Sequence, residues 1–220
     1  MPFTEEQFLR VFAQYNRAVW PAQLLLNAAA AAAVLLAAGK GLHSGRVVAA
    51  TLSLLWLWMG AVYHVLFFAA INPAAYVFGA LFVVEALLFF AVALGEKPVA
   101  FRFSDDAYGA CAAALFTYSL IAYPALGHIL GRVYPASPTF GLPCPTTIFT
   151  FGLLLCAEGE VPKRLLPVPL AWSLVGTLAA SNLGVTEDYA LAAAGLLGTA
   201  LIISRNGKLR AGKRVLRSAA

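Results

Sequence analysis

The sequence predicts an all-α, polytopic membrane protein: a bundle of seven transmembrane helices preceded by an amphipathic helix. Of its 220 residues, 61% are hydrophobic and only 11% are charged, and a soluble domain of this length cannot bury so much apolar surface. The apolar residues gather in runs of about 20, which is the length of a helix that crosses a bilayer. The links between these runs are rich in Gly, Pro and polar residues, as loops are.

The first segment, residues 1–18, predicts an amphipathic helix. Thr4 followed three residues later by Gln7 has the pattern of a capping box. Phe8, Phe12 and Tyr15 recur at helical spacing and form one apolar face. The segment begins with acidic residues rather than a basic region, so it is not a signal peptide. We expect it to lie in the lipid headgroup region and to lead into the first span.

The transmembrane domain is predicted to cover residues 19–204, and its seven spans lie near residues 19–38, 47–69, 72–94, 107–128, 143–158, 166–181 and 187–204. The fifth span is the shortest, because a helix from Pro145 to Ala157 is only about 20 Å long. The hydrocarbon layer is about 30 Å thick. We therefore expect the preceding segment to dip into the membrane, shielded by protein, with a thinned bilayer or an oblique short helix as the alternative.

The distribution of basic residues predicts the orientation. If the C-terminus is inside, only Arg10, Arg17 and Arg132 of the 15 Lys and Arg residues lie outside. This bias predicts an N-out, C-in protein of a bacterial inner membrane, with residues 205–220 as a basic cytoplasmic tail. Because the basic residues flank the spans, nucleic acid is not an expected partner. Three cysteines without regular spacing argue against a disulfide framework or a structural zinc site.

This orientation gathers several polar residues at the outer side. Cys144 is predicted to cap the fifth spanning helix, with Pro145 in its first position, and Asn72 and Pro73 have the same arrangement before the third. A helix that begins part-way through the bilayer and points its N-terminus at a cavity is a common transporter binding site. The predicted substrate-binding residues are Cys144, Thr146, Thr147, His64, Asn72 and Glu85.

Glu85 differs from the others because it is the only acid deep within a span. A carboxyl group at that depth is costly and indicates a proton or cation site. A structural glutamate bonded to a neighbouring helix is the alternative. Ser53, Gly60 and His64 share one face of the second span, a pattern that more often marks close helix packing than a pore.

Two chemistries are open to the outer residues. His64, His128 and Cys144 are a candidate ligand set for Zn or Cu, although His64 also fits a packed core residue and His128 an interfacial one. An enzyme using Cys144 requires a histidine close to the thiol. Glu187 and Asp188 are assigned to an outer loop, so the outer half offers almost no acid, and catalysis ranks below transport.

Three stretches carry a resemblance: PFTEEQFLRVFAQYNRAVWPAQ, YHVLFFAAINPAAYVFGALF and PTFGLPCPTTIFTFGLLL. Together they resemble an uncharacterised family of bacterial multi-pass membrane proteins, a domain of unknown function. The resemblance covers nearly the whole chain, and its third stretch is the most distinctive. It implies an integral membrane protein without a soluble domain, and it implies no activity.

The sequence thus predicts a protein that transports or senses a small solute or ion, with a soft metal as one variant, through an outward-opening cavity. One alternative is an intramembrane enzyme that uses Cys144 or a bound metal. Another is a structural or assembly partner with a dry, packed outer half. The expected partners are the lipid bilayer and the solute or ion, and a homo-oligomer is a further alternative.

Overall fold

The computed structural model describes residues 2–39, 44–96 and 99–218. Met1 and residues 40–43, 97–98 and 219–220, which belong to segments predicted above, lie outside the described residues. The described chain is helical and contains no β-strand beyond isolated bridges. Its elements in order are α1 (Glu5–Val19), α2 (Ala22–Ala38), α3 (Ser44–Leu57), η1 (Trp58–Phe67), η2 (Phe68–Ala70), α4 (Ala75–Leu94), α5 (Ala107–Thr117), η3 (Tyr118–Ala122), α6 (Tyr123–Ile129), α7 (Pro143–Leu155), η4 (Lys163–Leu165), α8 (Pro167–Leu183), η5 (Thr186–Asp188) and α9 (Tyr189–Ser218).

Each predicted span contains one helix or one continuous series of helical segments. In the described chain, five helices are long and apolar enough to cross a membrane, and α1 with α2 is a sixth candidate that bends by 86°. The apolar helix α7 has only 13 residues. The outer faces carry large exposed hydrophobic side chains, as lipid contact requires; among them are Leu25, Leu35, Leu66, Leu87, Ile121, Leu178 and Leu197.

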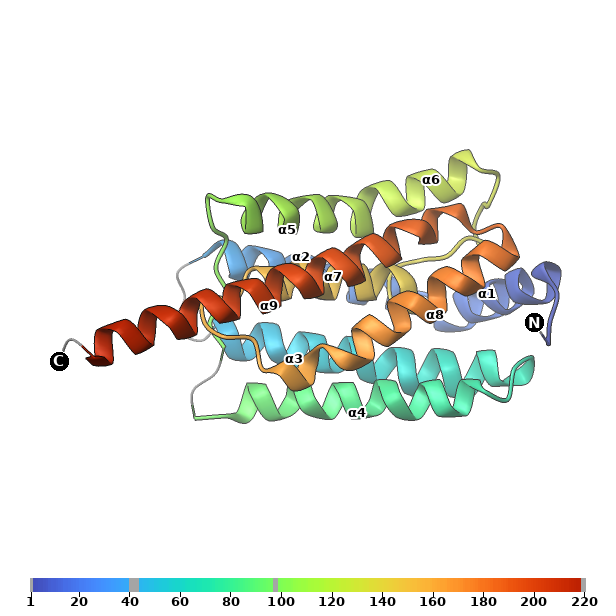
Figure 1. Cartoon of the computed structure of the whole chain (residues 1–220). Coiled ribbons are helices and arrows are strands. Elements are labelled where there is room, and N and C mark those ends of the chain that lie inside the picture. Colours follow the sequence, from blue (N-terminus) through green and yellow to red (C-terminus); the bar gives the residue numbers. More distant parts are fainter. Residues whose placement is uncertain (1, 40–43, 97–98, 219–220) are drawn as a thin grey trace.

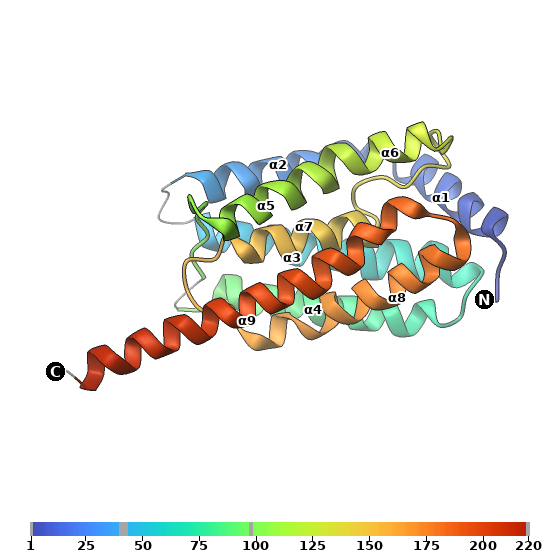
Figure 2. The same ribbon diagram turned by 45° about the horizontal axis from the view of Figure 1, so that its top comes forward.

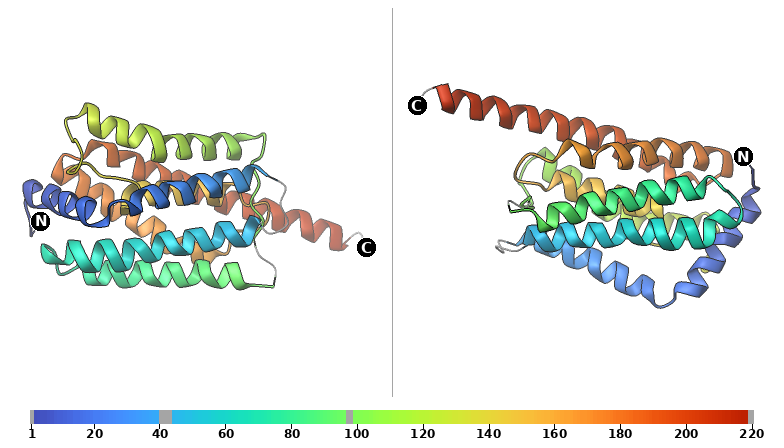
Figure 3. Two further views of the ribbon diagram at one scale, coloured as in Figure 1. Left: turned by 180° about the vertical axis from the view of Figure 1, so that it is seen from behind. Right: turned by 90° about the horizontal axis from the view of Figure 1, so that it is seen from below.

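The short helix α7 lies in the middle of the bundle (Figures 1 and 2). It packs against α5, α8 and α9, and every side chain from Pro145 to Leu155 is buried. A helix surrounded by other helices presents no face to lipid, so it needs neither the length nor the outer apolar stripe of a spanning helix. The other helices run roughly lengthwise around it, and α3 with α4 and α8 with α9 form helix hairpins (Figure 3).

The start of α7 corrects one prediction. The helix begins at Pro143 with Leu142 as its N-cap, so Cys144 lies inside the first turn rather than at the cap. Both prolines of the Pro143–Pro145 stretch are tolerated there, because first-turn residues need no backbone N–H donor. The helix therefore begins two residues earlier than a single proline at the first position would suggest.

We call the end of the bundle that carries α1, residues 130–142 and the turn at Gly184–Asp188 the α1 end (Figure 1). The predicted capping box of α1 is confirmed, since Gln7 N–H donates to Thr4 Oγ1 over 3.2 Å and Thr4 N–H to Gln7 Oε1 over 2.8 Å. The apolar face of α1 packs on the protein, where Phe12 contacts the Tyr63 ring of η1. Its location in the headgroup region stays a prediction.

The segment before α7 is held to α1 through Asn16, which is fully buried. Its side-chain amide donates to the carbonyls of Pro135 and Ser137 over 2.6 and 2.8 Å, and its oxygen accepts from Thr139 Oγ1 over 2.8 Å. These bonds satisfy backbone carbonyls that have no helical partner. These bonds fix the segment to α1, although Val133 and Tyr134 within it are exposed, and its expected position in the membrane stays a prediction.

The predicted close packing in the second span is confirmed. A Cβ on Gly60 would lie 2.8 Å from the Gly79 carbonyl oxygen, so η1 and α4 approach at backbone distance. In α3, before Gly60 in the same predicted span, Ser53 Oγ donates to the Ala86 carbonyl of α4 over 2.8 Å. Small residues at these positions let the two helices touch.

Candidate functional site

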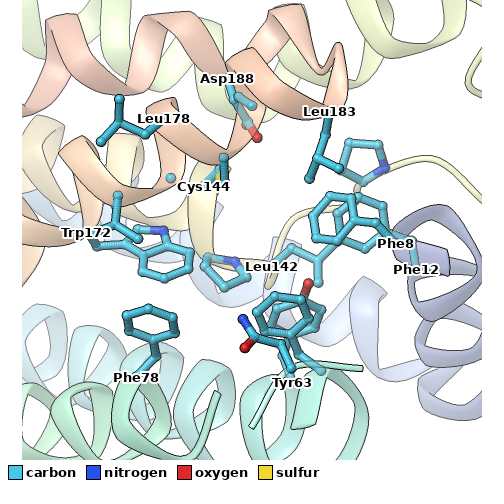
Figure 4. Close-up of a pocket in the computed structure, with 18 of the residues that line it drawn as sticks. Phe8, Phe12, Tyr63, Phe78, Leu142, Cys144, Trp172, Leu178, Leu183 and Asp188 are labelled. Carbon is cyan, nitrogen blue, oxygen red and sulfur yellow. The ribbon is translucent and has the colours of Figure 1, made fainter. Parts of the chain in front are cut away.

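The candidate site is a cavity of about 300 Å³ at the α1 end, between α1, η1, α4, the start of α7, and α8 (Figure 4). We call it the aromatic cavity, because eight of its lining side chains are aromatic: Phe3, Phe8, Phe12, Tyr63, Phe68, Phe78, Tyr123 and Trp172. Pro2, Leu178 and Asn182 belong to the lining and are exposed, so the cavity opens at the surface beside α1 and α8. Its volume is at the lower end of the range for small-molecule sites, about 300–1,000 Å³.

Two π-helical segments position aromatic residues of the cavity. Tyr63 belongs to η1, and Tyr123 directly follows η3. A π-helix is wider than an α-helix and turns the following side chains to new directions; such segments are frequent at functional sites. The Tyr63 ring stacks on Phe68 and meets Tyr15 of α1 edge to face. The aromatic side chains of the walls are thus packed against one another.

One wall of the cavity, formed by α6, α7, α8 and η5, carries several polar groups, while Tyr63 and Asn72 contribute others from the side of η1 and α4. Asp188 is buried and accepts a hydrogen bond from the Tyr123 hydroxyl. The half-buried Cys144 thiol lies beside the Asp188 carboxyl group (Figure 4). The Trp172 indole N–H lies near the Cys144 sulfur, but it makes no hydrogen bond of acceptable geometry. One buried donor of this wall therefore has no protein partner.

Within the described chain, Glu187, the residue before Asp188, has an ion-pair partner, unlike Asp188. Glu187 is buried and forms a two-point ion pair with Arg132, whose Nε donates to Glu187 Oε1 over 2.8 Å. The hydrogen bond to Glu187 raises the pKa of Arg132, and desolvation only partly opposes it. Tyr118 also donates to the Glu187 carbonyl over 2.7 Å. Together these bonds fix the turn that carries Asp188 into the cavity.

Of the predicted substrate-binding residues, Cys144 and Asn72 line the aromatic cavity. Asn72 does not cap α4 as predicted, because α4 begins at Ala75 with Ala74 as its N-cap. Its side-chain oxygen instead accepts from the Ala74 N–H over 3.1 Å. A short polar turn thus precedes the helix, and Asn72 stabilises that turn rather than the helix end.

The threonines of α7 do not line the cavity. Thr146 Oγ1 accepts from the Gly141 N–H over 3.1 Å, and Thr150 Oγ1 donates to the Thr146 carbonyl over 2.8 Å. Thr147 is buried, and its hydroxyl has no hydrogen-bond partner. For Thr146 the structure therefore supports a structural role in closing the segment before α7.

The three predicted metal ligands are not brought together. His64 is buried outside the cavity lining and its Nδ1 donates to the Met59 carbonyl over 2.8 Å, whereas His128 is exposed on α6. No group of three His, Cys, Asp or Glu side chains in the described part of the chain could hold a metal ion. Neither histidine lines the cavity beside Cys144, so the described residues do not show the histidine–thiol pair that the enzyme alternative requires.

Glu85 lies in the interior of α4, away from the cavity lining. It is fully buried, and neither carboxyl oxygen has a hydrogen-bond partner. The alternative of a glutamate bonded to a neighbouring helix is therefore not what the structure shows. Its assignment as a proton or cation site stays a prediction.

Sequence reasoning missed the most important acid of the site. Asp188 was assigned to an exposed loop, yet the link from α8 to α9 has only five residues, Gly184 to Asp188, and its acids lie at helix ends. The shortness of this link was the signal that could have indicated that Glu187 and Asp188 lie against the bundle. The sequence gives no such signal for Trp172 and the phenylalanines of α1, because their apolar spacing fits ordinary packing equally well. The cavity shows that the α1 end is not fully packed, whereas the assignment of this end to the outer half stays a prediction.

Comparison with known proteins gives one match. A family model described as "Family of unknown function (DUF6064)" matches residues 5–213. No curated protein and no solved structure matches the chain.

Proposed function

Because the chain belongs to the DUF6064 family of unknown function, whose description names no activity, we propose a function from the site alone. The protein recognises a small, largely apolar solute in the aromatic cavity, as the binding step of transport or sensing. The observation that carries this proposal is the cavity of about 300 Å³, whose lining is mostly aromatic and carries few polar groups. Apolar linings with few, convergent polar groups are typical of small-molecule sites.

The polar wall defines the solute further. The buried Trp172 N–H has no partner, and a buried unpartnered donor costs about 1–3 kcal/mol. A solute that places a hydrogen-bond acceptor beside Trp172 removes this cost. An apolar body therefore favours binding, and an acceptor beside Trp172 would strengthen it, whereas an inorganic metal ion is a poor fit for such walls.

We further propose that the protein crosses a bacterial inner membrane seven times, with the N-terminus outside and the C-terminus inside. Five long apolar helices, the bent pair of α1 and α2, and the central α7 support this number. The cationic end of α9 supports the orientation, because basic residues favour the cytoplasmic side. In this orientation the aromatic cavity opens near the outer surface.

Filling the cavity tests the proposal. Ala179 of α8 lines the cavity, and Ala179→Phe reduces its volume, whereas Ala171→Phe adds the same ring on an exposed part of α8 and serves as the matched control. Acetophenone, which has a ring and a carbonyl acceptor, is the probe. Alkylation of Cys144 by N-ethylmaleimide is followed by mass spectrometry, with Cys111 as an internal reference thiol.

Acetophenone is expected to slow the alkylation of Cys144 in the wild-type protein and in Ala171→Phe, and to leave Cys111 unaffected. In Ala179→Phe, acetophenone should bind at least tenfold more weakly, and Cys144 should be protected correspondingly less. Equal protection in all three proteins, or no protection in any of them, would overturn the proposed function.

A further inference from the structure

The charges around the aromatic cavity do not balance. Two neighbouring acids, Glu187 and Asp188, are buried at the start of α9. Arg132 is paired with Glu187 at two points, and its side chain is largely buried in that pair. Asp188 makes no ion pair with any side chain that the structure describes. Arg132 is therefore engaged by Glu187, and among the described side chains none forms an ion pair with Asp188, the acid that lines the cavity.

The hydrogen bonds of Asp188 stabilise a carboxylate, whereas its burial beside Glu187 without a counter-ion on any described residue makes that charge costly. The Tyr123 hydroxyl donates to Asp188 Oδ1, and the Cys144 thiol is a second potential donor beside the same carboxyl group. Bonds from donors stabilise a carboxylate more than a carboxylic acid. Asp188 also directly precedes the N-terminus of α9, where the helix dipole favours negative charge. A cation that enters the cavity therefore supplies the counter-ion that this buried carboxyl group lacks among the described side chains.

The aromatic side chains around the cavity suit a cation that has apolar substituents. Tyr63, Phe78 and Trp172 approach the cavity from three elements, η1, α4 and α8. The faces of such rings attract a cation within about 6 Å of the ring centroid, and the attraction is larger where water is excluded. A hydrated metal ion gains little from these walls, because its water would be lost without oxygen ligands to replace it.

We propose that the aromatic cavity binds an organic cation, namely a small apolar molecule that carries a quaternary ammonium or a protonated amine beside Asp188. The inference rests on the proposed function and names the chemical class of its solute. The positive charge replaces the missing ion-pair partner of Asp188, and the apolar substituents fill the volume between the aromatic walls.

The test compares two probes of nearly the same shape, phenyltrimethylammonium and neutral tert-butylbenzene. The affinity of each probe is obtained by measuring how its free concentration affects the protection of Cys144 from N-ethylmaleimide. In the wild-type protein we expect the cation to bind at least tenfold more tightly than the hydrocarbon. This ratio needs no variant, so it decides the question even if a substitution prevents folding.

Asp188→Asn removes the charge and keeps an acceptor for Tyr123. We expect this variant to lose at least tenfold in affinity for phenyltrimethylammonium and to bind tert-butylbenzene as the wild-type protein does. Asp105→Asn is the matched control, because Asp105 is exposed at the other end of the bundle. It should bind both probes with wild-type affinity.

The outcomes separate this inference from the function on which it rests. If the wild-type protein binds both probes equally well and Ala179→Phe weakens both, the cavity binds apolar solutes and the preference for cations is refuted. If Asp188→Asn folds and binds the cation with wild-type affinity, Asp188 is not its counter-ion and the inference is equally refuted. If neither probe protects Cys144, the proposed function fails together with the inference.

Discussion

The Glu85 carboxyl group is a costly polar group in the interior of the long apolar helix α4. Both of its oxygens are buried without a hydrogen-bond partner. Such groups are usually retained because of function, at the expense of stability. Glu85 is therefore a residue at which stability and function are expected to oppose each other.

Glu85→Leu should stabilise the protein by about 1–3 kcal/mol, because it removes an unpartnered buried polar group and leaves a side chain of similar size. Glu85→Gln is the control, since it keeps a polar group without a partner and should gain little. Thermal unfolding in detergent measures both variants. A lower melting temperature for Glu85→Leu than for the wild-type protein would show that the carboxyl group has a stabilising partner.

At the scale of the elements, the close contact between η1 and α4 determines where Tyr63 and Phe78 stand around the cavity. The contact depends on Gly60 and Gly79, because each would place a Cβ against the carbonyl oxygen of the other. Backbone atoms cannot move aside as a flexible side chain can.

Gly60→Ala should destabilise the protein by about 1–3 kcal/mol, since the added methyl group forces the two helices apart. Gly207→Ala is the matched control, because a Cβ there meets no atom within 4 Å. Alanine normally stabilises an exposed helix relative to glycine by about 0.5–1 kcal/mol. Chemical or thermal unfolding compares the two, and a Gly60→Ala protein as stable as the Gly207→Ala protein would contradict the described contact.

The last helix offers a pH-dependent contact outside the bundle. Glu160 accepts from Arg210 Nε over 2.6 Å and from Lys213 Nζ over 3.1 Å. These hydrogen bonds lower the pKa of Glu160 from its ordinary value of 4.5. Because the folded-state pKa is lowered, the contact stabilises α9 fully above pH 4.5 and is lost as the pH falls through the lowered pKa.

A spin label at Ala211 should therefore become more mobile when the pH is lowered from 7 to well below 4.5. In Glu160→Gln the label should already be more mobile at neutral pH and should change little on acidification. Electron paramagnetic resonance measures this mobility. A label whose mobility follows the same pH curve in both proteins would show that Glu160 does not hold the helix end.

At the scale of the whole molecule, the aromatic cavity lies at the α1 end and the basic end of α9 extends from the other (Figure 3). Arg205 and Asn206 tie α9 to the chain after α7, through bonds to the carbonyls of Leu155 and Val161 over 2.7 and 2.8 Å. The two ends thus differ in chemistry, and a membrane would distinguish them.

Single-cysteine labelling tests the proposed orientation. In a protein whose three native cysteines are replaced by alanine, a membrane-impermeant maleimide on intact cells should label Val133→Cys at the α1 end. It should label Lys208→Cys only after the cells are permeabilised. The reverse pattern would refute the N-out, C-in orientation and place the cavity on the cytoplasmic side.

The sequence by itself determined the helices of this protein, because apolar run length, helical spacing and capping residues act within one segment. The capping box of Thr4 and Gln7, the short fifth helix and the close packing around Gly60 all followed from such local patterns. Cys144 was correctly expected to face a cavity for the same reason, since its position at the start of a short helix is local information.

The partners of Cys144 were decided only by the tertiary structure. Asp188 belongs to a turn that the sequence presents as an ordinary polar loop, and it lines the cavity because Arg132 and Tyr118, far away in the chain, hold that turn. Phe8, Phe12 and Trp172 form walls because α1 folds back onto the bundle and α8 turns one face inward. Which side chains meet depends on the rotation and crossing of whole helices, and that rotation is fixed by the sum of many contacts rather than by any one segment.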